Sequence, residues 1–421
     1  MEAAFFISYL LFFCFIITIT PFFKKSGINK PVLIFIFIIK VIAGIAYAQF
    51  YKLPKYYAEA DTWRFFRLSL EEKKWLLSDP IAFLKDLFVY GYHSSGSLFN
   101  GENSYWNDLK SNIPIKLLAI MNVITNDSYY TDIILFNFIF FIGLVALYKL
   151  FFHYYPQQKW LVIIGVFLLP SCLFWCSGIH KDGLILSALG ILLYLFDKCM
   201  KRGFSLKYSG VIFLASLLLF SLRNYLFFAL VPALFCWFIA QKYPAKSRAI
   251  FFITYSTIIF TIIITTLILP SLNPLVILSD KQHEFLQLGG GSSVISQPLL
   301  PTFKSFIKYL PNALDMGFLR PHVNEVSNPA YIPAIVETVL VLLLITFSLF
   351  FNWRKLKVTP FFLFMIFFSI SIVMICGYTI PITGAVVRYR SIVLPLLITP
   401  LLCSQNLINL YISKKSNYSK Q

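Results

Sequence analysis

The 421-residue chain is 58% apolar and 13% charged, and its formal net charge is +18. A soluble globule of this length could not bury so much apolar surface, so the composition predicts an integral membrane protein. Its cations are scattered over short connectors without an aromatic-interleaved basic patch, which argues against nucleic acid as a partner.

Apolar runs long enough to cross roughly 30 Å of hydrocarbon recur along the whole chain. They predict an all-α polytopic membrane protein with about eleven transmembrane helices, forming one integral membrane domain over residues 1–421. The predicted spans are residues 3–23, 31–50, 130–152, 160–176, 183–198, 208–222, 225–241, 249–270, 331–352, 359–377 and 391–411.

When these spans are threaded through a bilayer, nearly all acidic residues fall on one side of it. The short connectors on one side carry half of the 36 Lys and Arg residues, and Asp197 is their one acid. Short Lys- and Arg-rich loops mark the cytoplasmic side. The sequence therefore predicts an amino terminus outside, a carboxyl terminus in the cytoplasm, and two large exterior loops at residues 51–129 and 271–330.

Both exterior loops contain apolar residues at helical spacing, which suits helices that lie in the membrane surface or pack on the bundle. The first set is Ile81, Leu84 and Phe88, and the second is Phe303, Phe306, Ile307 and Leu310, with Lys304 and Lys308 on the other side. Helices in the membrane surface could guide a lipid-borne substrate, whereas the alternative is that they only pack on the bundle.

Two carboxylates follow the second predicted span. Glu59 and Asp61 are two residues apart and are followed by Arg64. Carboxylates at this place could accept a proton, or hold Mg²⁺ or Mn²⁺ if further oxygen ligands came from elsewhere. The alternative is a solvated loop start with an internal ion pair.

A second polar group lies in the exterior turn 170–183, where His180, Lys181 and Asp182 are consecutive within an apolar stretch. Charges at a bilayer boundary are costly unless they are paired or functional, so the turn is a candidate site. The alternative is a helix start capped by Ser177. The next exterior turn places Arg223 between two spans, where we expect it at the outer interface.

The last exterior turns contain further charged residues. Arg320 and Glu325 flank a turn before the next span, Glu337 lies within that span, and Arg388 and Arg390 share a short turn. A glutamate in an apolar helix needs a cation or a hydrogen-bond donor, and two neighbouring arginines suit a grip on phosphate oxygens. The alternative for the arginines is snorkelling at a helix end.

Taken together, the exterior turns retain cations where the positive-inside rule disfavours them. They are Arg64, Lys181, Arg223, Arg320, Arg388 and Arg390. This pattern predicts a polyanion at the outer face, and an isoprenoid-linked phosphate or pyrophosphate sugar is the natural one for a multispanning protein. Asp61 or Glu59 would then deprotonate the acceptor hydroxyl, and the arginines would stabilise the leaving phosphate.

These motifs resemble those of known membrane enzymes. Glu59-x-Asp61 resembles the acidic exterior-loop motif of lipid-sugar-dependent glycosyltransferases of the C superfamily. The turns at 170–182, 320–325 and 388–390 are similar to those of bacterial polysaccharide-biosynthesis membrane proteins related to O-antigen polymerases.

The resemblance implies glycosyl transfer or polymerisation in cell-envelope polysaccharide synthesis, at the outer face of a bacterial inner membrane. It implies an undecaprenyl-linked saccharide donor and a glycan acceptor, with Asp61 as the family's carboxylate beside Glu59. Arg388 and Arg390 would bind substrate. Such glycosyltransferases commonly place the acidic loop after the first helix, whereas in this chain it follows the second predicted span. This difference favours the polymerase branch.

Two other classes fit less well. A transporter or flippase of lipid-linked saccharides would also need exterior cations, but it should place polar residues through the membrane midplane. Lys40 and Glu337 are the main charges expected within the spans. A membrane acyltransferase would need a histidine deep in a span, and all five histidines fall in loops or at helix ends.

Overall fold

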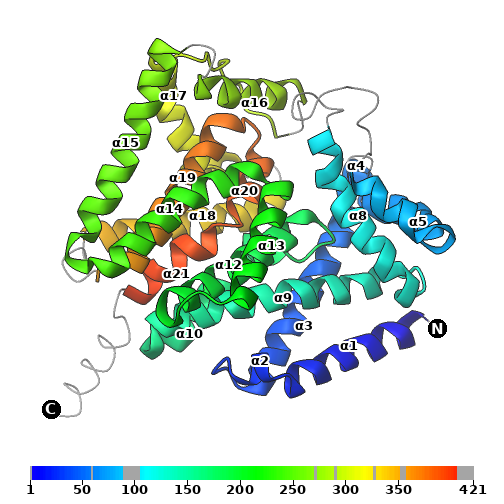
Figure 1. Cartoon of the computed structure of the whole chain (residues 1–421). Coiled ribbons are helices and arrows are strands. Elements are labelled where there is room, and N and C mark those ends of the chain that lie inside the picture. Colours follow the sequence, from blue (N-terminus) through cyan, green and yellow to red (C-terminus); the bar gives the residue numbers. More distant parts are fainter. Residues whose placement is uncertain are drawn as a thin grey trace. The chain divides into compact units, whose positions relative to one another are not determined.

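The computed structural model describes residues 2–57, 60–88, 105–269, 273–288, 292–325, 329–350 and 357–404. Within these ranges the chain is helical (Figure 1), and the β contact recorded there is an isolated bridge between Ser293 and Ile382. The predicted all-α class is confirmed.

Seven helices of the described part are long and apolar enough to cross a membrane. They are α1 (Glu2–Ile19), α3 (Lys30–Phe50), α9 (Tyr129–Tyr154), α12 (Lys181–Arg202), α14 (Asn224–Lys242), α15 (Ser247–Ile268) extended by η3 (Pro244–Lys246), and α19 (Pro360–Thr379). An eighth span results if α20 (Thr383–Arg390) and α21 (Leu394–Ser404), which meet at 61°, are taken together. The chain is therefore a membrane protein with seven or eight candidate spans, and the count of about eleven is not confirmed.

Three of the expected spans take a different form. The run at 160–176 divides into α10 (Lys159–Phe167) and α11 (Pro170–Trp175). Pro170 lacks an N–H and its ring would collide with the preceding turn, so α10 ends before it. The other two are α13 (Leu206–Leu222) and α18 (Ile332–Phe350), whose apolar helices, Leu206–Leu222 and Ile332–Ser348, are shorter than the seven.

The chain forms two compact units, and the boundaries between them fall within α9, α11 and α14. Unit 1 comprises Met1–Leu150 and Leu173–Phe227, and unit 2 comprises Phe151–Cys172 and Phe228–Gln421. Each is described by itself.

Unit 1 is organised around α3, α9 and α12. Phe37 of α3 and Phe141 of α9 are buried with ring centroids 5.6 Å apart. The rest of the unit is α1, α2 (Pro21–Lys24), α4 (Pro54–Tyr57), α5 (Asp61–Ser78), α6 (Pro80–Lys85), η1 (Asp86–Phe88), α8 (Tyr105–Thr125) and α13. Helices α5 and α8 pack along each other (Figure 1), so the described part of the predicted exterior loop 51–129 contains a pair of packed helices.

The helix expected around residues 81–88 forms as α6 followed by η1. Asp79 caps α6 by accepting a hydrogen bond from the Ala82 N–H at 2.9 Å, and Pro80 occupies the first turn. Phe83 is buried, whereas Ile81 and Leu84 are exposed. An orientation of α6 in the membrane surface stays a prediction.

Unit 2 is built around α19, against which α15, α16 (Pro274–Leu288), α17 (Phe303–Leu314) and α21 pack. Its aromatic core includes Trp237 stacked on Phe364 at 4.7 Å and Tyr154 stacked on Phe361 at 4.0 Å. The remaining short elements are η2 (Pro156–Gln158), η5 (Asp315–Leu319), η6 (Val323–Glu325) and η7 (Pro329–Tyr331).

Two helices bury very little of their surface within their own unit. In α1 the buried residue is Ile17, and in α15 the buried residues are Ser247 and Phe251. Most of their exposed side chains are apolar. A helix with apolar residues on every side needs lipid or protein around it.

Candidate functional site

The turn between α11 and α12 is fixed against α3. The Lys40 ammonium donates to the Cys176 carbonyl at 2.6 Å and to Ser177 Oγ at 2.9 Å, and both residues are buried. Two glycines allow this approach. A Cβ on Gly44 would lie 2.6 Å from the Ser177 carbonyl oxygen, and one on Gly178 would lie 2.1 Å from Tyr47 Cδ1.

His180 is the N-cap of α12, and Phe65 of α5 stacks on its ring with centroids 5.8 Å apart. The expected cap, Ser177, instead receives the Lys40 ammonium. The histidine was predicted as part of the candidate turn, and its complete burial against α5 gives it a fixed orientation.

A continuous chain of polar groups runs through His180. Asp61 Oδ2 is 3.2 Å from His180 Nε2, and His180 Nδ1 is 3.0 Å from Asp182 Oδ2. The second carboxylate oxygen of Asp182 accepts from the Arg223 guanidinium. We call these four residues, Asp61, His180, Asp182 and Arg223, the relay.

The relay is buried at one end and open at the other. The side chains of His180 and Asp182 are 0% exposed and that of Arg223 is 3% exposed, whereas that of Asp61 is 34% exposed. A proton that reaches the relay from solvent therefore enters it at Asp61.

The hydrogen-bond geometry constrains the protons of the relay. Nδ1 of His180 also faces the Asp182 backbone N–H, but at 3.4 Å, so the carboxylate at 3.0 Å is its stronger partner. With Nδ1–H donating to Asp182, Nε2 faces Asp61 as an acceptor, and a proton taken up by Asp61 can be shared with it. Asp61 can thus accept a proton with an imidazole directly behind it.

Arg223 differs from the interfacial cation expected from the sequence. Its guanidinium is buried and also donates to the Tyr225 hydroxyl at 3.0 Å. A buried charge is stable only when it is paired, and Asp182 provides that pair. In this structure Arg223 positions Asp182 within the relay.

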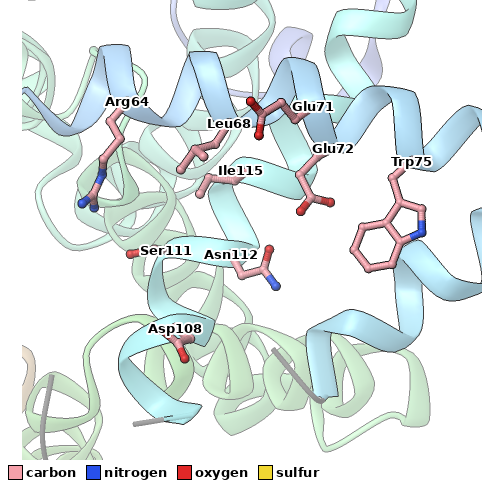
Figure 2. A pocket seen from close by; sticks show the side chains of 9 residues that line it. All are labelled: Arg64, Leu68, Glu71, Glu72, Trp75, Asp108, Ser111, Asn112 and Ile115. Carbon is pink, nitrogen blue, oxygen red and sulfur yellow. The ribbon is translucent and has the colours of Figure 1, made fainter. Parts of the chain in front are cut away.

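Arg64 connects the relay to a cavity. Its Nη2 lies 3.4 Å from Asp61 Oδ1, and its side chain lines a cavity of about 460 Å³ between α5 and α8. Figure 2 shows Arg64 at one end of this cavity and Trp75 at the other. We call it the α5–α8 cavity. Its lining residues are Arg64, Leu68, Glu71, Glu72, Trp75, Asp108, Ser111, Asn112 and Ile115.

A buried ion network supports the cavity wall. Lys116 Nζ lies 2.8 Å from Glu72 Oε2 and 2.9 Å from Asp86 Oδ2, and it sits 4.9 Å from the centre of the Trp75 ring. Asn112 donates to Asp86 at 2.9 Å. These contacts hold Glu72, Trp75 and Asn112 in fixed positions around the opening.

In unit 2, Arg320 is held by two acids. Its Nε lies 3.0 Å from Asp315 Oδ2, and its Nη1 donates to Glu325. His322 Nε2 lies 2.7 Å from the other oxygen of Asp315. Arg320 and Glu325, predicted as substrate-binding residues of one turn, therefore form an ion cluster with Asp315.

Glu337 and Arg390 belong to a second buried group in unit 2. Glu337 accepts from the Ser171 N–H at 3.0 Å and from the Ser171 hydroxyl. Arg390 donates to the Gly317 carbonyl at 3.1 Å and to Thr338 Oγ1 at 2.6 Å. Arg390 is buried in protein, so snorkelling does not describe it.

The remaining predicted site residues are Glu59, Lys181 and Arg388. Glu59 lies outside the described residues. Lys181 begins α12 and Arg388 lies in α20, and both side chains are half-buried. The gathering of all six exterior cations around one anion stays a prediction.

The α5–α8 cavity was missed by the sequence analysis, although its spacing was readable. Its residues recur on α5 as Arg64, Leu68, Glu72 and Trp75, and on α8 as Asp108, Ser111, Asn112 and Ile115. Spacings of three and four residues place each set on one helix face.

The described side chains that could ligate a metal ion do not support a bound metal. No group of three or more His, Cys, Asp or Glu side chains suited to a metal ion occurs among the described residues. Arg64 also places a cation directly against Asp61. We derive no step through Mg²⁺ or Mn²⁺.

Comparisons with known proteins give no relative. No protein-family model, curated protein or solved structure matches the chain.

Proposed function

We propose that this chain transfers a glycosyl unit from a polyprenyl-phosphate-linked or polyprenyl-pyrophosphate-linked saccharide to a glycan acceptor. The reaction would take place at the outer face of a bacterial inner membrane, during cell-surface polysaccharide synthesis. The observation that carries the proposal is the relay, in which one accessible carboxylate is backed by a buried histidine and a second carboxylate.

Asp61 is the general base in this proposal. It takes the proton of the acceptor hydroxyl as that oxygen bonds to the anomeric carbon of the donor. The bond between the anomeric carbon and the phosphate oxygen breaks, and its electron pair leaves with the phosphate. His180 then shares the proton, and Asp182 with Arg223 stabilises the imidazolium.

Two cations next to the relay suit the leaving phosphate. Arg64 is 57% exposed and lies one helical turn from Asp61, and Lys181 begins the helix that Asp182 belongs to. Charge-assisted hydrogen bonds to a developing phosphate anion strengthen as the bond to carbon breaks. Arg223 is not needed for this role because it is committed to Asp182.

The test is deletion of the gene with analysis of surface glycans and lipid-linked intermediates, followed by complementation. Unpolymerised repeats on lipid would indicate a polymerase, and a truncated repeat would indicate a single-unit transferase. Asp61→Asn should fail to restore product at normal protein level. Asp127→Asn is the matched control, because Asp127 lies in an exposed pair with Lys73 outside the relay.

A reporter fusion checks the side of the membrane. Fusions within α8 should report the exterior. A cytoplasmic location for α8 would contradict the proposal, because the acceptor glycan would then be on the opposite side.

The second candidate function is transport of lipid-linked saccharides, and Lys40 is the observation that favours it. Lys40 is ten residues from either end of α3, or about 15 Å along the helix, which places a charge near the middle of a span. Reconstituted protein that flips a fluorescent polyprenyl-phosphate sugar, without forming a new glycosidic bond, would favour transport. Transfer without flipping would exclude it.

A further inference from the structure

The α5–α8 cavity has a definite relationship to Asp61. The cavity extends along α5 from Arg64 to Trp75, about 16 Å at the rise of an α-helix. Asp61 lies one turn beyond its Arg64 end and contacts Arg64 at 3.4 Å. A molecule bound along the cavity would therefore end next to the accessible carboxylate of the relay.

The cavity has the size and composition of a small-molecule site. Its volume of about 460 Å³ lies within the roughly 300 to 1,000 Å³ common for such sites. Leu68, Ile115 and Trp75 provide apolar surface, while Ser111, Asn112 and Glu72 provide donors and acceptors. This combination suits a pyranose, whose C–H face is apolar and whose hydroxyls both donate and accept.

The charges of the cavity disfavour an ionic ligand. The Glu72 carboxylate is paired with Lys116, and Arg64 faces the Asp61 carboxylate at the end of the cavity. Oδ2 of Asp108 is buried and has no hydrogen-bond partner among the described residues, and burial raises the pKa of this carboxyl above its usual value of 3.8. Glu71 is exposed. Away from Arg64, the lining residues include no cation that would hold a phosphate within the cavity.

We infer that the α5–α8 cavity binds the neutral saccharide acceptor, with Trp75 packing on a sugar ring and Glu72, Asn112 and Asp108 bonding its hydroxyls. The inference rests on the proposed function for the identity of its ligand as an acceptor. It assigns the sugar to the cavity and leaves the donor phosphate to Arg64 at the end of the cavity and to Lys181 outside it.

The test measures saccharide binding without turnover. The full chain in lipid nanodiscs is examined by saturation-transfer-difference NMR with methyl glycosides of glucose, galactose, rhamnose and N-acetylglucosamine and with their disaccharides. Inorganic phosphate and spermidine serve as charged probes. At least one neutral glycoside should bind at millimolar concentration, and neither charged probe should compete with it.

Two variants locate the binding. Trp75→Leu should weaken it about tenfold or more, because an aromatic packing surface is lost, and Trp160→Leu on α10 is the control. Glu71→Arg should block the rim without unfolding the chain, because Glu71 is exposed, and Glu284→Arg on α16 is its control. The inference is overturned if no glycoside binds, if phosphate or spermidine binds in its place, or if both cavity variants bind like wild type.

Failure of this inference is distinguishable from failure of the proposed function. Asp61→Asn should lose transfer and keep glycoside binding. Binding in a protein that transfers nothing would overturn the function alone, whereas transfer without binding in the cavity would overturn the cavity assignment alone.

Discussion

Asp182 bridges His180 and Arg223 with its two carboxylate oxygens. Oδ2 lies 3.0 Å from His180 Nδ1, and Oδ1 accepts from the Arg223 guanidinium. All three side chains are buried, so the carboxylate cannot exchange either partner for water. Each of them therefore depends on the other two for its orientation and its charge.

Asp182→Asn should slow transfer by roughly a hundredfold or more, because the imidazolium loses its counter-charge. It should also change the pH dependence of the rate, which a general loss of folding would not do. The pH–rate profile of purified variant and wild type is the measurement. An unchanged profile at normal rate would remove Asp182 from the mechanism.

Arg223→Met should destabilise the protein by roughly 3 to 5 kcal/mol, because the buried Asp182 carboxylate loses its guanidinium partner. Thermal unfolding in nanodiscs checks this. Arg202→Met is the matched control, since Arg202 is exposed at the end of α12. The double variant Asp182→Asn with Arg223→Met should lose less than the sum of the single changes.

Gly178→Ala and Gly210→Ala should have opposite effects on thermal stability. A Cβ at position 178 would lie 2.1 Å from Tyr47. Such overpacking typically lowers the free energy of unfolding by about 1 to 3 kcal/mol. At position 210 nothing lies within 4 Å of the added atom, and alanine favours the helix by roughly 0.5 to 1 kcal/mol. Equal melting temperatures for the two variants would show that the turn is not packed tightly on α3.

Arg388→Ala and Arg390→Met should separate binding from stability. Arg390 donates to Gly317 and Thr338 within unit 2, so its loss should lower the melting temperature. Arg388 is half-buried, and we expect its loss to weaken substrate capture, seen as a raised KM, while the melting temperature stays near that of wild type. If Arg388→Ala instead lowered the melting temperature and Arg390→Met raised KM alone, Arg390 would be the substrate-binding residue and Arg388 the stabilising one.

Asp108→Asn should remove a pH dependence of stability. Burial raises the pKa of the Asp108 carboxyl, so the folded state holds this proton more tightly than the unfolded state. Its contribution to stability is lost as pH rises from the ordinary value of 3.8 through the raised pKa. The asparagine variant cannot ionise, so its melting temperature should exceed that of wild type at neutral pH and the difference should shrink in acid. The cavity charges facing this group are Arg64, Glu71 and Glu72, and they are unchanged in the comparison.

Much of the fold could be predicted because lipid imposes simple rules on sequence. Long apolar runs give helices, and the runs at 31–50, 183–198 and 359–377 correspond to α3, α12 and α19. The run at 160–176 is equally apolar, but Pro170 divides it, so apolarity alone overstates the number of continuous spans.

The site could be predicted in its parts and not in its connections. Asp61, His180 and Asp182 were each recognisable as polar residues beside apolar helices, but the contact between Asp61 and His180 joins positions 119 residues apart. Arg223 was expected at the interface because a lone arginine at a helix end normally reaches water. Its burial depends on Asp182, a partner that only the folded chain reveals.

Helices α1 and α15 bury so few side chains within their own units that the surrounding lipid, or a further protein surface, must cover them. The native arrangement is then a joint property of polypeptide and lipid. Extraction into a short-chain detergent should loosen these two helices before it disturbs the relay. The choice of solubilising environment therefore becomes an experimental variable in its own right.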